Sequence, residues 1–408
     1  MSIHNIQNII MLKILMIISF FLSFSLNTAA QPLKIGDTIP DIEIDNIINS
    51  TSTKINLSHL KGKVILLDFW ATWCKPCLQG FPKLESLQNN NSNKLQVIAI
   101  SREPSSRLEK FLKNRPINVM VASDTLQVIN QFFPHIWLPH AVLIDGDGVV
   151  RAITDGENIT KEVLQAVIKK QTPSISVKMD DLSFNPETYF TPSEQTVSDF
   201  KITSHAKGGG AQMMPGEGVF KDRRWTYINV LFINLFQNAY GFNNMRTKKE
   251  NIDKAELEYV PNNQYCVDII VEKPGVESIR KELQKHLAQH FNYKARIEKR
   301  KDSVFVLRKI DRTSELLVKV ENGGKNNWWG SRGKFNGSGI RLSKVGEYLE
   351  QFNLVKKPVI DETGDIQYYD VQVKWEHEKT SGVQEFVTSL GLELVPAIRE
   401  YEVLIIYK

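Results

Sequence analysis

Buried strands and amphipathic helices alternate along the first part of the chain, over residues 33–171. The run 64–70 is almost continuously apolar, as in a strand buried on both faces, and 95–100 repeats this pattern. Apolar positions at helical spacing predict helices at 77–88, 107–113 and 160–170. A tight turn at 145–148 between two short apolar runs indicates a hairpin. This order predicts an α/β domain with a mixed sheet and helices on both faces.

A change of composition indicates a linker after this domain. Three prolines and many Ser and Thr residues lie within 172–198, together with the acidic pair Asp180 and Asp181. Proline and small polar residues interrupt helices and strands. We therefore expect a first domain at 31–171, a linker at 172–198 and a second domain at 199–408.

The second domain has an α+β pattern that indicates an internal duplication. Repeats at 226–309 and 340–408 begin with helices at 228–240 and 343–352, and a strand, a helix and two further strands follow in each. The paired final strands are predicted at 293–298 and 304–309, and at 392–398 and 401–408. A glycine-rich loop, 323–339, would join the repeats. Chance agreement between two α/β patterns is the alternative.

The N-terminus has the parts of a secretory signal. Lys13 precedes the apolar run 14–26, and small residues follow at 28–30. The run is shorter than the roughly 18–20 apolar residues of a membrane-spanning helix. We expect export to the periplasm or cell envelope with cleavage after Ala30; an uncleaved membrane anchor is the alternative. The segment contains no Cys, which excludes a lipidated cysteine anchor.

Charge and composition exclude few functions. The 408 residues are 42% hydrophobic and 24% charged, as in ordinary globular proteins. The formal net charge is +5, and the basic residues are spread along the sequence. A nucleic-acid binder gathers its basic residues into a patch or stripe, so we expect no nucleic-acid partner.

Two of the three cysteines, Cys74 and Cys77, lie three positions apart, and Cys266 is distant. A disulfide-stapled secreted protein carries more cysteines at wider spacing. A zinc site needs four ligands, and no pair of His flanks the motif. A structural disulfide over so short a ring would restrain little chain. We therefore predict a redox-active pair and no cofactor beyond this disulfide.

The run Trp73-Cys74-Lys75-Pro76-Cys77 suits thiol chemistry. A thiolate is the nucleophile in disulfide exchange, and the start of a helix favours negative charge. Lys75 adds a positive neighbour, and Pro76 fits the first helical turn. Cys74 is therefore the predicted attacking thiol. Cys77, one step into the helix, should be more buried and act as the resolving thiol.

Asp68 and Pro139 are the other candidates for this site. An acid within an apolar strand is costly to bury, so Asp68 is predicted to take the proton from Cys77; a buried acid paired with Lys or water is the alternative. Pro139 opens the strand 141–144, where proline is uncommon. We predict a cis Leu138–Pro139 bond beside the cysteines, with the Leu138 backbone pairing with substrate. A turn proline is the alternative.

Residues 64–82, with Leu138-Pro139 and 144–148, resemble the TlpA/ResA branch of thioredoxin-like proteins, which are extracytoplasmic bacterial thiol–disulfide oxidoreductases. The resemblance covers about 33–171 and implies a thioredoxin-like fold with an extra segment around 101–118. It implies the same roles for the two cysteines, the buried acid and the cis proline. It also implies protein disulfide substrates and a membrane thiol-reducing electron donor.

Two residues depart from this family's pattern. Gly80 stands where the cytochrome-maturation members usually carry Glu, which argues against an apocytochrome c substrate. His140 follows the proline where Thr is commoner, and it is a candidate for changing substrate choice or the thiolate pKa.

The second domain resembles an uncharacterised family abundant in soil bacteria. The similar stretches are 216–220, the helix that ends at Tyr240, and 358–364 before Tyr369-Asp370. Because the activity of that family is unknown, the resemblance implies architecture and no mechanism.

Other chemically notable residues of the second domain are expected to have structural roles. Cys266 lies in an apolar strand, where a core role is expected. Trp328-Trp329 could stack on a sugar, a peptide or a partner, and loop anchoring is the favoured interpretation. Asp361, Glu362 and Asp365 indicate an acidic turn rather than a metal site.

The sequence thus predicts an extracytoplasmic thiol–disulfide oxidoreductase that reduces protein disulfides through a mixed disulfide. A thiol peroxidase is one alternative, but that pattern requires Thr three residues before the attacking cysteine, where Ala71 stands. An envelope protein that binds a partner or ligand through its second domain, with an accessory redox domain, is the other.

Overall fold

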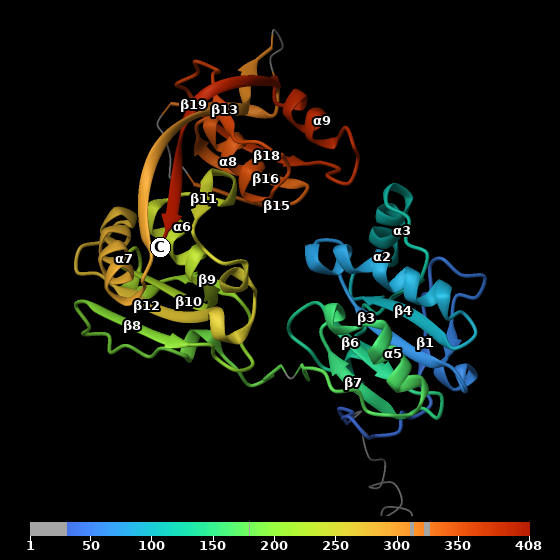
Figure 1. Ribbon diagram of the computed structural model, residues 1–408. Helices are drawn as coiled ribbons and strands as arrows, with labels where there is room; N and C mark the ends of the chain where they lie inside the picture. The colour runs from blue at the N-terminus through green and yellow to red at the C-terminus, as the bar shows by residue number, and fades with distance from the viewer. Residues whose placement is uncertain (1–30, 179, 311–313, 322–326) are drawn as a thin grey trace, which may run out of the picture. The chain divides into compact units, whose positions relative to one another are not determined.

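The computed structural model describes residues 31–178, 180–310, 314–321 and 327–408. The predicted signal segment, 1–30, lies outside the described residues. The chain divides into two compact units, and the first consists of residues up to Leu108 and of Ile117–Lys178 (Figure 1). No helix within the described ranges is long and apolar enough to cross a membrane.

The first unit is built on a mixed sheet with the strand order β5-β4-β3-β6-β7. Its strands are β3 (Val64–Phe69), β4 (Leu95–Ser101), β5 (Met120–Ser123), β6 (His140–Ile144) and β7 (Val150–Thr154). Its helices are α2 (Lys75–Asn90), α3 (Ser105–Asn114), α4 (Val128–Phe132) and α5 (Lys161–Ile168). Strands β3, β4 and β5 are parallel, whereas β6 and β7 are antiparallel. The predicted α/β fold with a mixed sheet is confirmed.

Strand β3 is the central strand of this sheet, so the residues that follow its carboxyl end lie at the middle of one edge of the sheet. Side chains of a strand alternate between its two faces. Ile65, Leu67 and Phe69 belong to one hydrophobic cluster, together with short N-terminal strands β1 (Glu43–Ile44) and β2 (Ile55–Asn56). Asp68 lies on the opposite face, with Leu66. The strand therefore carries a buried carboxyl group to within a few residues of Cys74.

Three four-stranded sheets form the described part of the second unit. Their orders are β8-β12-β10-β9, β14-β18-β16-β15 and β11-β19-β13-β17. The strands of the first half are β8 (Asp199–Ser204), β9 (Gln212–Pro215), β10 (Arg224–Leu231), β11 (Thr247–Glu250), β12 (Gln264–Ile270) and β13 (Lys294–Lys309). Those of the second half are β14 (Leu317–Val320), β15 (Asn327–Ser331), β16 (Lys334–Ile340), β17 (Val359–Asp361), β18 (Tyr368–Lys374) and β19 (Leu392–Tyr407).

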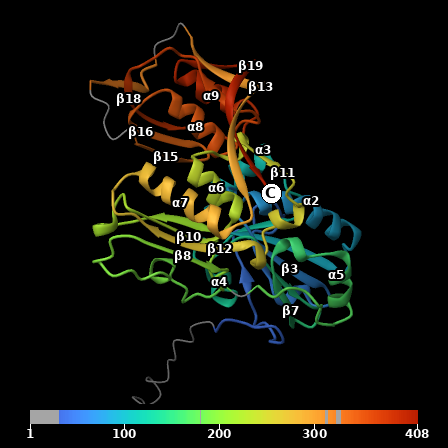
Figure 2. The ribbon, with the colours of Figure 1, turned by 60° about the vertical axis from the view of Figure 1, so that its left-hand side comes forward.

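Helices occupy corresponding places in the two halves. The first half has α6 (Phe232–Tyr240) and α7 (Val276–His290), and the second has α8 (Ser343–Gln351) and α9 (Gly382–Ser389). Helices α6 and α7 pack on one face of the β8-β12-β10-β9 sheet, as Figure 2 shows. The orders β8-β12-β10-β9 and β14-β18-β16-β15 match strand for strand. This correspondence supports the proposed duplication, with each half beginning two strands earlier than the repeat bounds taken from the sequence.

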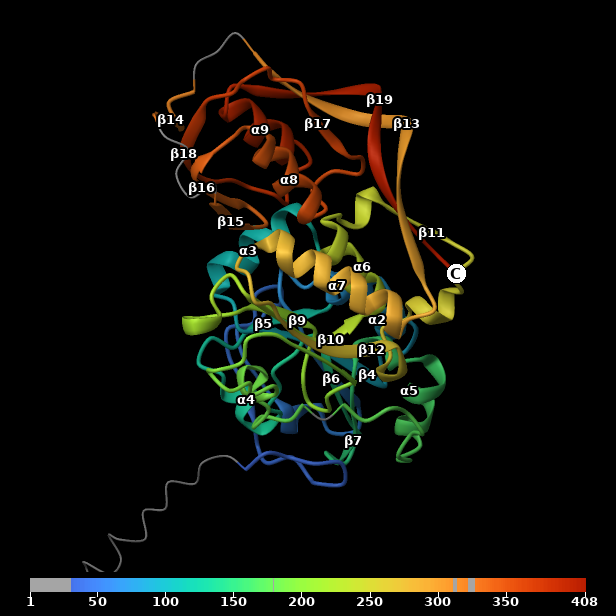
Figure 3. The ribbon, with the colours of Figure 1, turned by 90° about the vertical axis from the view of Figure 1, so that its left-hand side faces the viewer.

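Long strands correct the predicted ends of both repeats. Each predicted pair of short strands is a single 16-residue strand, β13 or β19. The two strands pair antiparallel from Lys294↔Tyr407 to Lys309↔Leu392, and Figure 3 shows them side by side. The polar residues in the middle of β13 and of β19 led us to predict a break between two short strands. Each polar segment continues as strand because opposite charges face each other there, for example Lys301 and Glu400.

Two further elements differ from the expectation. Residues 228–231 extend strand β10 rather than beginning a helix, because they pair with β12 and β9 on either side. Strands β15 and β16 occupy most of the predicted glycine-rich loop, whose residues 322–326 lie outside the described ranges.

The predicted linker, 172–198, packs against the units on either side of it. The Thr154 hydroxyl donates to the Ser176 carbonyl at 2.7 Å, and the Lys178 N–H donates to the Ile153 carbonyl at 2.9 Å. In the second unit, Arg224 donates to the Phe190 carbonyl at 2.9 Å, and Phe190 is buried. Side chains and neighbouring backbone satisfy these groups, so the described part of this proline-rich segment is held in place although its regular structure is limited to a 3-10 turn, Pro186–Thr188.

Candidate active site

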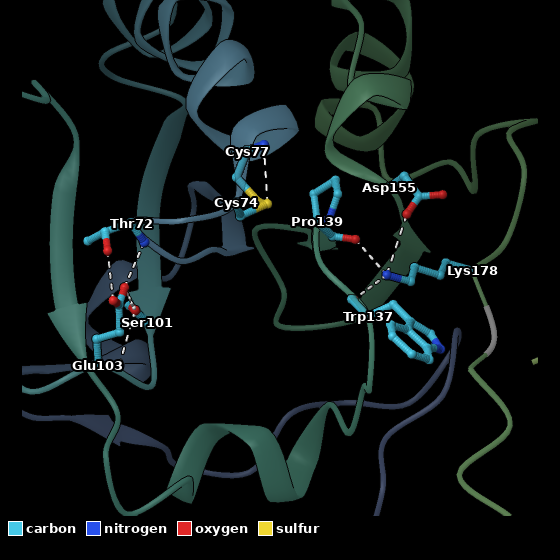
Figure 4. The surroundings of a disulfide bond; sticks show 9 residues. All are labelled: Thr72, Cys74, Cys77, Ser101, Glu103, Trp137, Pro139, Asp155 and Lys178. Atoms are coloured by element: carbon cyan, nitrogen blue, oxygen red, sulfur yellow. Dashed lines mark hydrogen bonds and ion pairs between the residues drawn. A yellow bond between two sulfur atoms is a disulfide. The ribbon is translucent and has the colours of Figure 1, made fainter. Parts of the chain in front are cut away.

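The cysteine pair lies at the N-terminus of α2, where the chain leaves the central strand (Figure 4). Cys74 is the N-cap residue, and Cys74 and Cys77 are joined by a disulfide bond. The Cys77 N–H points at the Cys74 sulfur over 3.4 Å. Pro76 lies in the first turn, as predicted. The Lys75 side chain lies outside what the structure describes. The helix terminus therefore favours a negative charge on Cys74 once the disulfide is reduced.

Exposure does not distinguish the two cysteines, contrary to our prediction. Cys74 and Cys77 are each 4% exposed. In the disulfide form the bonded sulfurs shield one another, so a position further along the helix brings no additional burial. Trp73, directly before the pair, is 63% exposed. The place of Cys74 at the helix terminus, and not its exposure, therefore distinguishes it as the predicted attacking thiol.

A carboxylate from the next strand holds the loop that leads to Cys74. Glu103 follows β4 and accepts hydrogen bonds from the Thr72 N–H at 2.6 Å and the Thr72 hydroxyl at 2.7 Å. Ser101 donates to the same carboxylate at 3.3 Å, and Arg107 donates to the Thr72 hydroxyl at 3.0 Å. Charge-assisted bonds of this kind are among the stronger ones in proteins. The network fixes the backbone two residues before the reactive sulfur (Figure 4).

Asp68 is a buried acid, 3% exposed, at the end of the central strand. Burial raises the pKa of Asp68 to about 7. A Cβ atom added to Gly156 would lie 3.3 Å from the Asp68 carboxylate and 3.9 Å from Pro139. The carboxylate and the proline therefore both lie close to the backbone of Gly156. Lys83 of α2 donates to the Glu157 carbonyl at 2.7 Å, which ties the cysteine helix to the same segment.

The Leu138–Pro139 peptide bond is cis, as predicted. Its loop is held by Lys178, whose ammonium donates to the Trp137 and Pro139 carbonyls at 2.5 Å each. Asp155 lies 3.5 Å from the same ammonium. Figure 4 shows Pro139 facing the cysteine pair and Lys178 behind the loop. The carbonyls on either side of Leu138 are thus engaged within the protein.

His140 is buried between aromatic rings. It stacks on His135 with ring centroids 4.5 Å apart and meets the edge of Phe69 at 5.4 Å. Burial, with positive neighbours, lowers the pKa of His140 to about 2. The ring is therefore neutral at physiological pH and supplies no positive charge to a thiolate. Its packing fixes the start of β6 directly after the cis bond.

A cavity of about 180 Å³ lies next to the cysteine loop. Its lining combines Trp73 with Ile136 and Leu138, the residue before the cis proline. Ile136 is 41% exposed, so an apolar surface accompanies the backbone groups of the loop. Such a surface suits an extended peptide that carries the target disulfide.

Comparison with known proteins identifies the first unit. The Redoxin family matches residues 34–168. The thiol-disulfide oxidoreductase ResA of Bacillus thuringiensis is 33% identical over 148 residues, which cover 36% of this chain and 83% of that protein. The chain belongs to the ResA-type thiol–disulfide oxidoreductases. The thioredoxin-like protein YneN of Bacillus subtilis is 32% identical over 32% of this chain and 76% of its own length.

The second unit of this oxidoreductase matches a different family. Residues 234–408 match a family described as a protein of unknown function, DUF3738. This agrees with the predicted fusion to an uncharacterised domain. Among solved structures, the thioredoxin domain of a thiol-disulfide oxidoreductase from Bacteroides vulgatus is similar over 35% of this chain and 99% of that chain. Its sequence is 19% identical, with a TM-score of 0.29.

The structure gathers most of the predicted site residues at one sheet edge and adds some that sequence reasoning missed. Glu103 follows a buried strand parallel to β3, so its position at the carboxyl edge of the sheet was a usable signal. Lys178 gave no signal, since it lies in the predicted linker, 39 residues beyond Pro139. His135 likewise had no motif to mark it.

The cysteine and the acidic residues singled out in the second unit of the oxidoreductase have partners that indicate structural roles. Cys266 is fully buried, and its sulfur lies 3.3 Å from the Asn229 side-chain oxygen. Glu362 pairs with Arg308 and Arg399, and Asp365 with Lys309. Among the described residues, no group of three His, Cys, Asp or Glu side chains is arranged to hold a metal ion.

Proposed function

We propose that this oxidoreductase reduces protein disulfides outside the cytoplasm through its Cys-Lys-Pro-Cys motif. The Cys74 thiolate attacks one sulfur of the target disulfide, whose S–S bond breaks and releases one substrate thiolate. The Cys77 sulfur then attacks Cys74 Sγ, which breaks the mixed disulfide, frees the second substrate thiolate and leaves the Cys74–Cys77 disulfide. Each released thiolate takes up a proton. The helix terminus at Cys74 supports this assignment of the attacking thiol.

Asp68 accepts the proton of Cys77 in the resolving step. An acceptor works best when its pKa is close to the working pH. The pKa of Asp68, about 7, meets this condition, whereas an ordinary aspartate would be too weak a base. The closeness of both Asp68 and Pro139 to Gly156 supports a place near the reacting sulfurs.

The cis-proline loop binds the substrate chain. Lys178 engages the carbonyls of Trp137 and Pro139, and the Leu138 backbone between them pairs with an extended substrate segment. Gly80 has open space around its backbone and carries no side chain at the position where the cytochrome-maturation members usually carry Glu. This position therefore gives no support to an apocytochrome c substrate. The predicted signal segment supports export, and a membrane thiol-reducing carrier would return electrons to the pair.

The direction of electron flow is tested by the reduction potential of the Cys74–Cys77 pair. The full chain is equilibrated with glutathione buffers, and the fraction of disulfide is measured by thiol labelling, with Cys74→Ser as the blank. A value near the roughly −270 mV of thioredoxin supports a reductant. A value near the roughly −120 mV of DsbA would make the protein an oxidant and overturn the proposed direction.

A further inference from the structure

One face of the β14-β18-β16-β15 sheet carries an aligned row of aromatic and amide side chains. Phe335 of β16 is fully buried in the core of the second half, so its neighbour Asn336 faces the opposite side of the sheet. Trp329 pairs with Asn336 across one strand boundary, and Gln372 pairs with Asn336 across the next. These three side chains therefore form a cross-strand row on the outer face.

The two adjacent tryptophans of β15 have different surroundings. Trp328 packs inward from strand β15, with its ring 5.9 Å from those of Phe335 and Tyr348, so it contacts the core from a strand and not from the predicted loop. Trp329 points outward and is 57% exposed. The Lys334 ammonium lies 4.3 Å from the centroid of the Trp329 ring. The Lys334 ammonium covers one face of the indole, and the remaining exposed surface of Trp329 is available at the outer face.

Asn336 is a buried polar residue at the centre of this row. The residue is only 6% exposed, and within the described ranges neither its side-chain nitrogen nor its oxygen has a hydrogen-bond partner. Buried polar groups are nearly always paired, because an unpaired one costs free energy. Asn336 also lines a cavity of about 530 Å³, together with Trp329, Asn327, Ser338, Asp370 and Gln372. Its amide is available to a molecule in that cavity.

The corresponding face of the first half is occupied by the protein itself. There Thr226 and Arg224 both donate to the Asp268 carboxylate, at 2.6 and 2.8 Å, and Arg224 also donates to the Phe190 carbonyl. Phe190 packs there against Ile228 and Cys266. In the second half the matching strands carry the open cavity. The two halves have the same sheet order, but the Thr226 position of the first half is paired with Asp268, whereas Asn336 of the second half has no side-chain partner among the described residues.

We propose that the cavity over β15, β16 and β18 binds a neutral oligosaccharide. A sugar ring presents a flat face of C–H bonds to an aromatic ring and a rim of hydroxyl groups that both donate and accept. The Trp329 ring can stack on the C–H face of the sugar. The Asn336, Asn327 and Gln372 amides can form hydrogen bonds with its hydroxyl groups. The acidic residues Glu315 and Asp370 also line the cavity, which disfavours an anionic chain. Pockets of this size hold small ligands.

The test uses the full-length protein and soluble neutral hexasaccharides built from glucose, xylose, mannose or N-acetylglucosamine. Binding is measured by calorimetry at millimolar sugar. At least one probe should bind, and Trp329→Ala should weaken its affinity about tenfold, the value of a lost aromatic contact. Asn336→Ala should weaken it as well. No binding by any of these probes, or unchanged affinity in Trp329→Ala, overturns the proposal.

Matched variants distinguish a neutral sugar from a charged ligand or a peptide. Trp329→Phe keeps an aromatic face and should retain most of the affinity, while thermal melting monitors folding of every variant. Lys334→Met should leave neutral-sugar affinity within about twofold, since no charge is recognised. Tight binding of a galacturonate hexamer that Lys334→Met abolishes would show an anionic ligand instead. Binding of an uncharged extended peptide in place of every sugar would also contradict the proposal.

Discussion

Two buried acids, Asp68 of the first unit and Glu350 of the second, have different surroundings. In the first unit, Asp68 is buried at the end of the central strand, and burial raises its pKa to about 7. In the second unit, Glu350 is equally buried but accepts hydrogen bonds from Arg246 at 2.7 Å, Asn243 at 2.6 Å and the Val359 N–H at 2.7 Å. One acid can change its charge near neutral pH, and the other has charged and polar partners that stabilise its carboxylate.

The partners of a buried acid distinguish a catalytic role from a structural one. A buried acid with a cation and hydrogen-bond donors as partners fixes the elements that it joins, and removing one partner is costly. A buried acid without such a cation keeps its proton until near-neutral pH, which is costly for folding and useful in proton transfer. Four predictions test this comparison, beginning with the reacting sulfur itself.

Removing the attacking sulfur should have the largest effect. Cys74→Ser should lower the rate of insulin reduction at least about a thousandfold, because a hydroxyl is a poor nucleophile at neutral pH. Cys266→Ser, at the buried cysteine of the second unit, is the matched control and should keep the wild-type rate. Equal losses in the two variants would refute the assignment of the chemistry to the first unit.

Breaking the paired acid should destabilise the second unit without affecting the chemistry. Arg246→Met leaves Glu350 buried beside an apolar side chain, and we expect a loss of about 3 kcal/mol in the free energy of unfolding, measured in urea. Arg399→Met breaks a more exposed pair with Glu362, which water screens, and should cost much less stability. Insulin reduction at low temperature should stay at the wild-type rate in both. Similar losses of stability would contradict the structural role of Glu350.

Neutralising Asp68 should slow the resolving step about a hundredfold. Below pH 7 the carboxyl group carries a proton and cannot accept another, so the wild-type rate should rise with pH and level off above about 7. Asp68→Asn should lose this inflection. Stopped-flow release of thiol from a preformed mixed disulfide measures the step.

Asp145→Asn is the control for this pH profile. Asp145 is buried in the same unit, but it accepts hydrogen bonds from Arg151 at 2.7 Å and from the backbone N–H groups of Asp147 and Val149. The inflection near pH 7 should persist in Asp145→Asn. If Asp145→Asn also lost the inflection, the pH dependence of the resolving step could not be assigned to Asp68.

Loosening the cis-proline loop should have the smallest effect. Lys178→Met removes the donor to the Trp137 and Pro139 carbonyls, and KM for a protein disulfide should rise about tenfold. A small aromatic disulfide, which has no backbone to pair with Leu138, should react at the wild-type rate. Lys170→Met, at an exposed pair with Asp147, is the control. Equal losses for both substrates would assign Lys178 a purely structural role.

Much of the first unit could be predicted from sequence, because local patterns determine its elements. The continuous apolar run predicts β3, and Pro76 beside the cysteines predicts the start of α2. Strand β5 and helix α4 were missed, since four or five residues carry too little periodicity. In the second unit the paired charges of β13 and β19 were mistaken for a break, because cross-strand partners lie about a hundred residues apart.

The candidate site was predictable where its residues belong to one motif or strand. Cys74, Cys77 and Asp68 lie within ten residues of one another, and the proline before a strand was itself unusual. Glu103, Lys178 and His135 depend on contacts between distant segments, which no spacing encodes. The equal exposure of the two cysteines depends on the disulfide, a state of the pair rather than a property of either position.

The long strands β13 and β19 exchange core residues between the halves of the second unit. Leu404 and Ile406 of β19 complete the core of the first half, while Leu307 of β13 enters that of the second. Neither half can bury its own apolar surface alone, so the two should unfold in one cooperative transition. During synthesis, the first half must wait for residues 392–407 before its core closes. If the chain crosses a membrane with its N-terminus first, the second unit therefore stays unfolded until β19, its last strand, has also crossed.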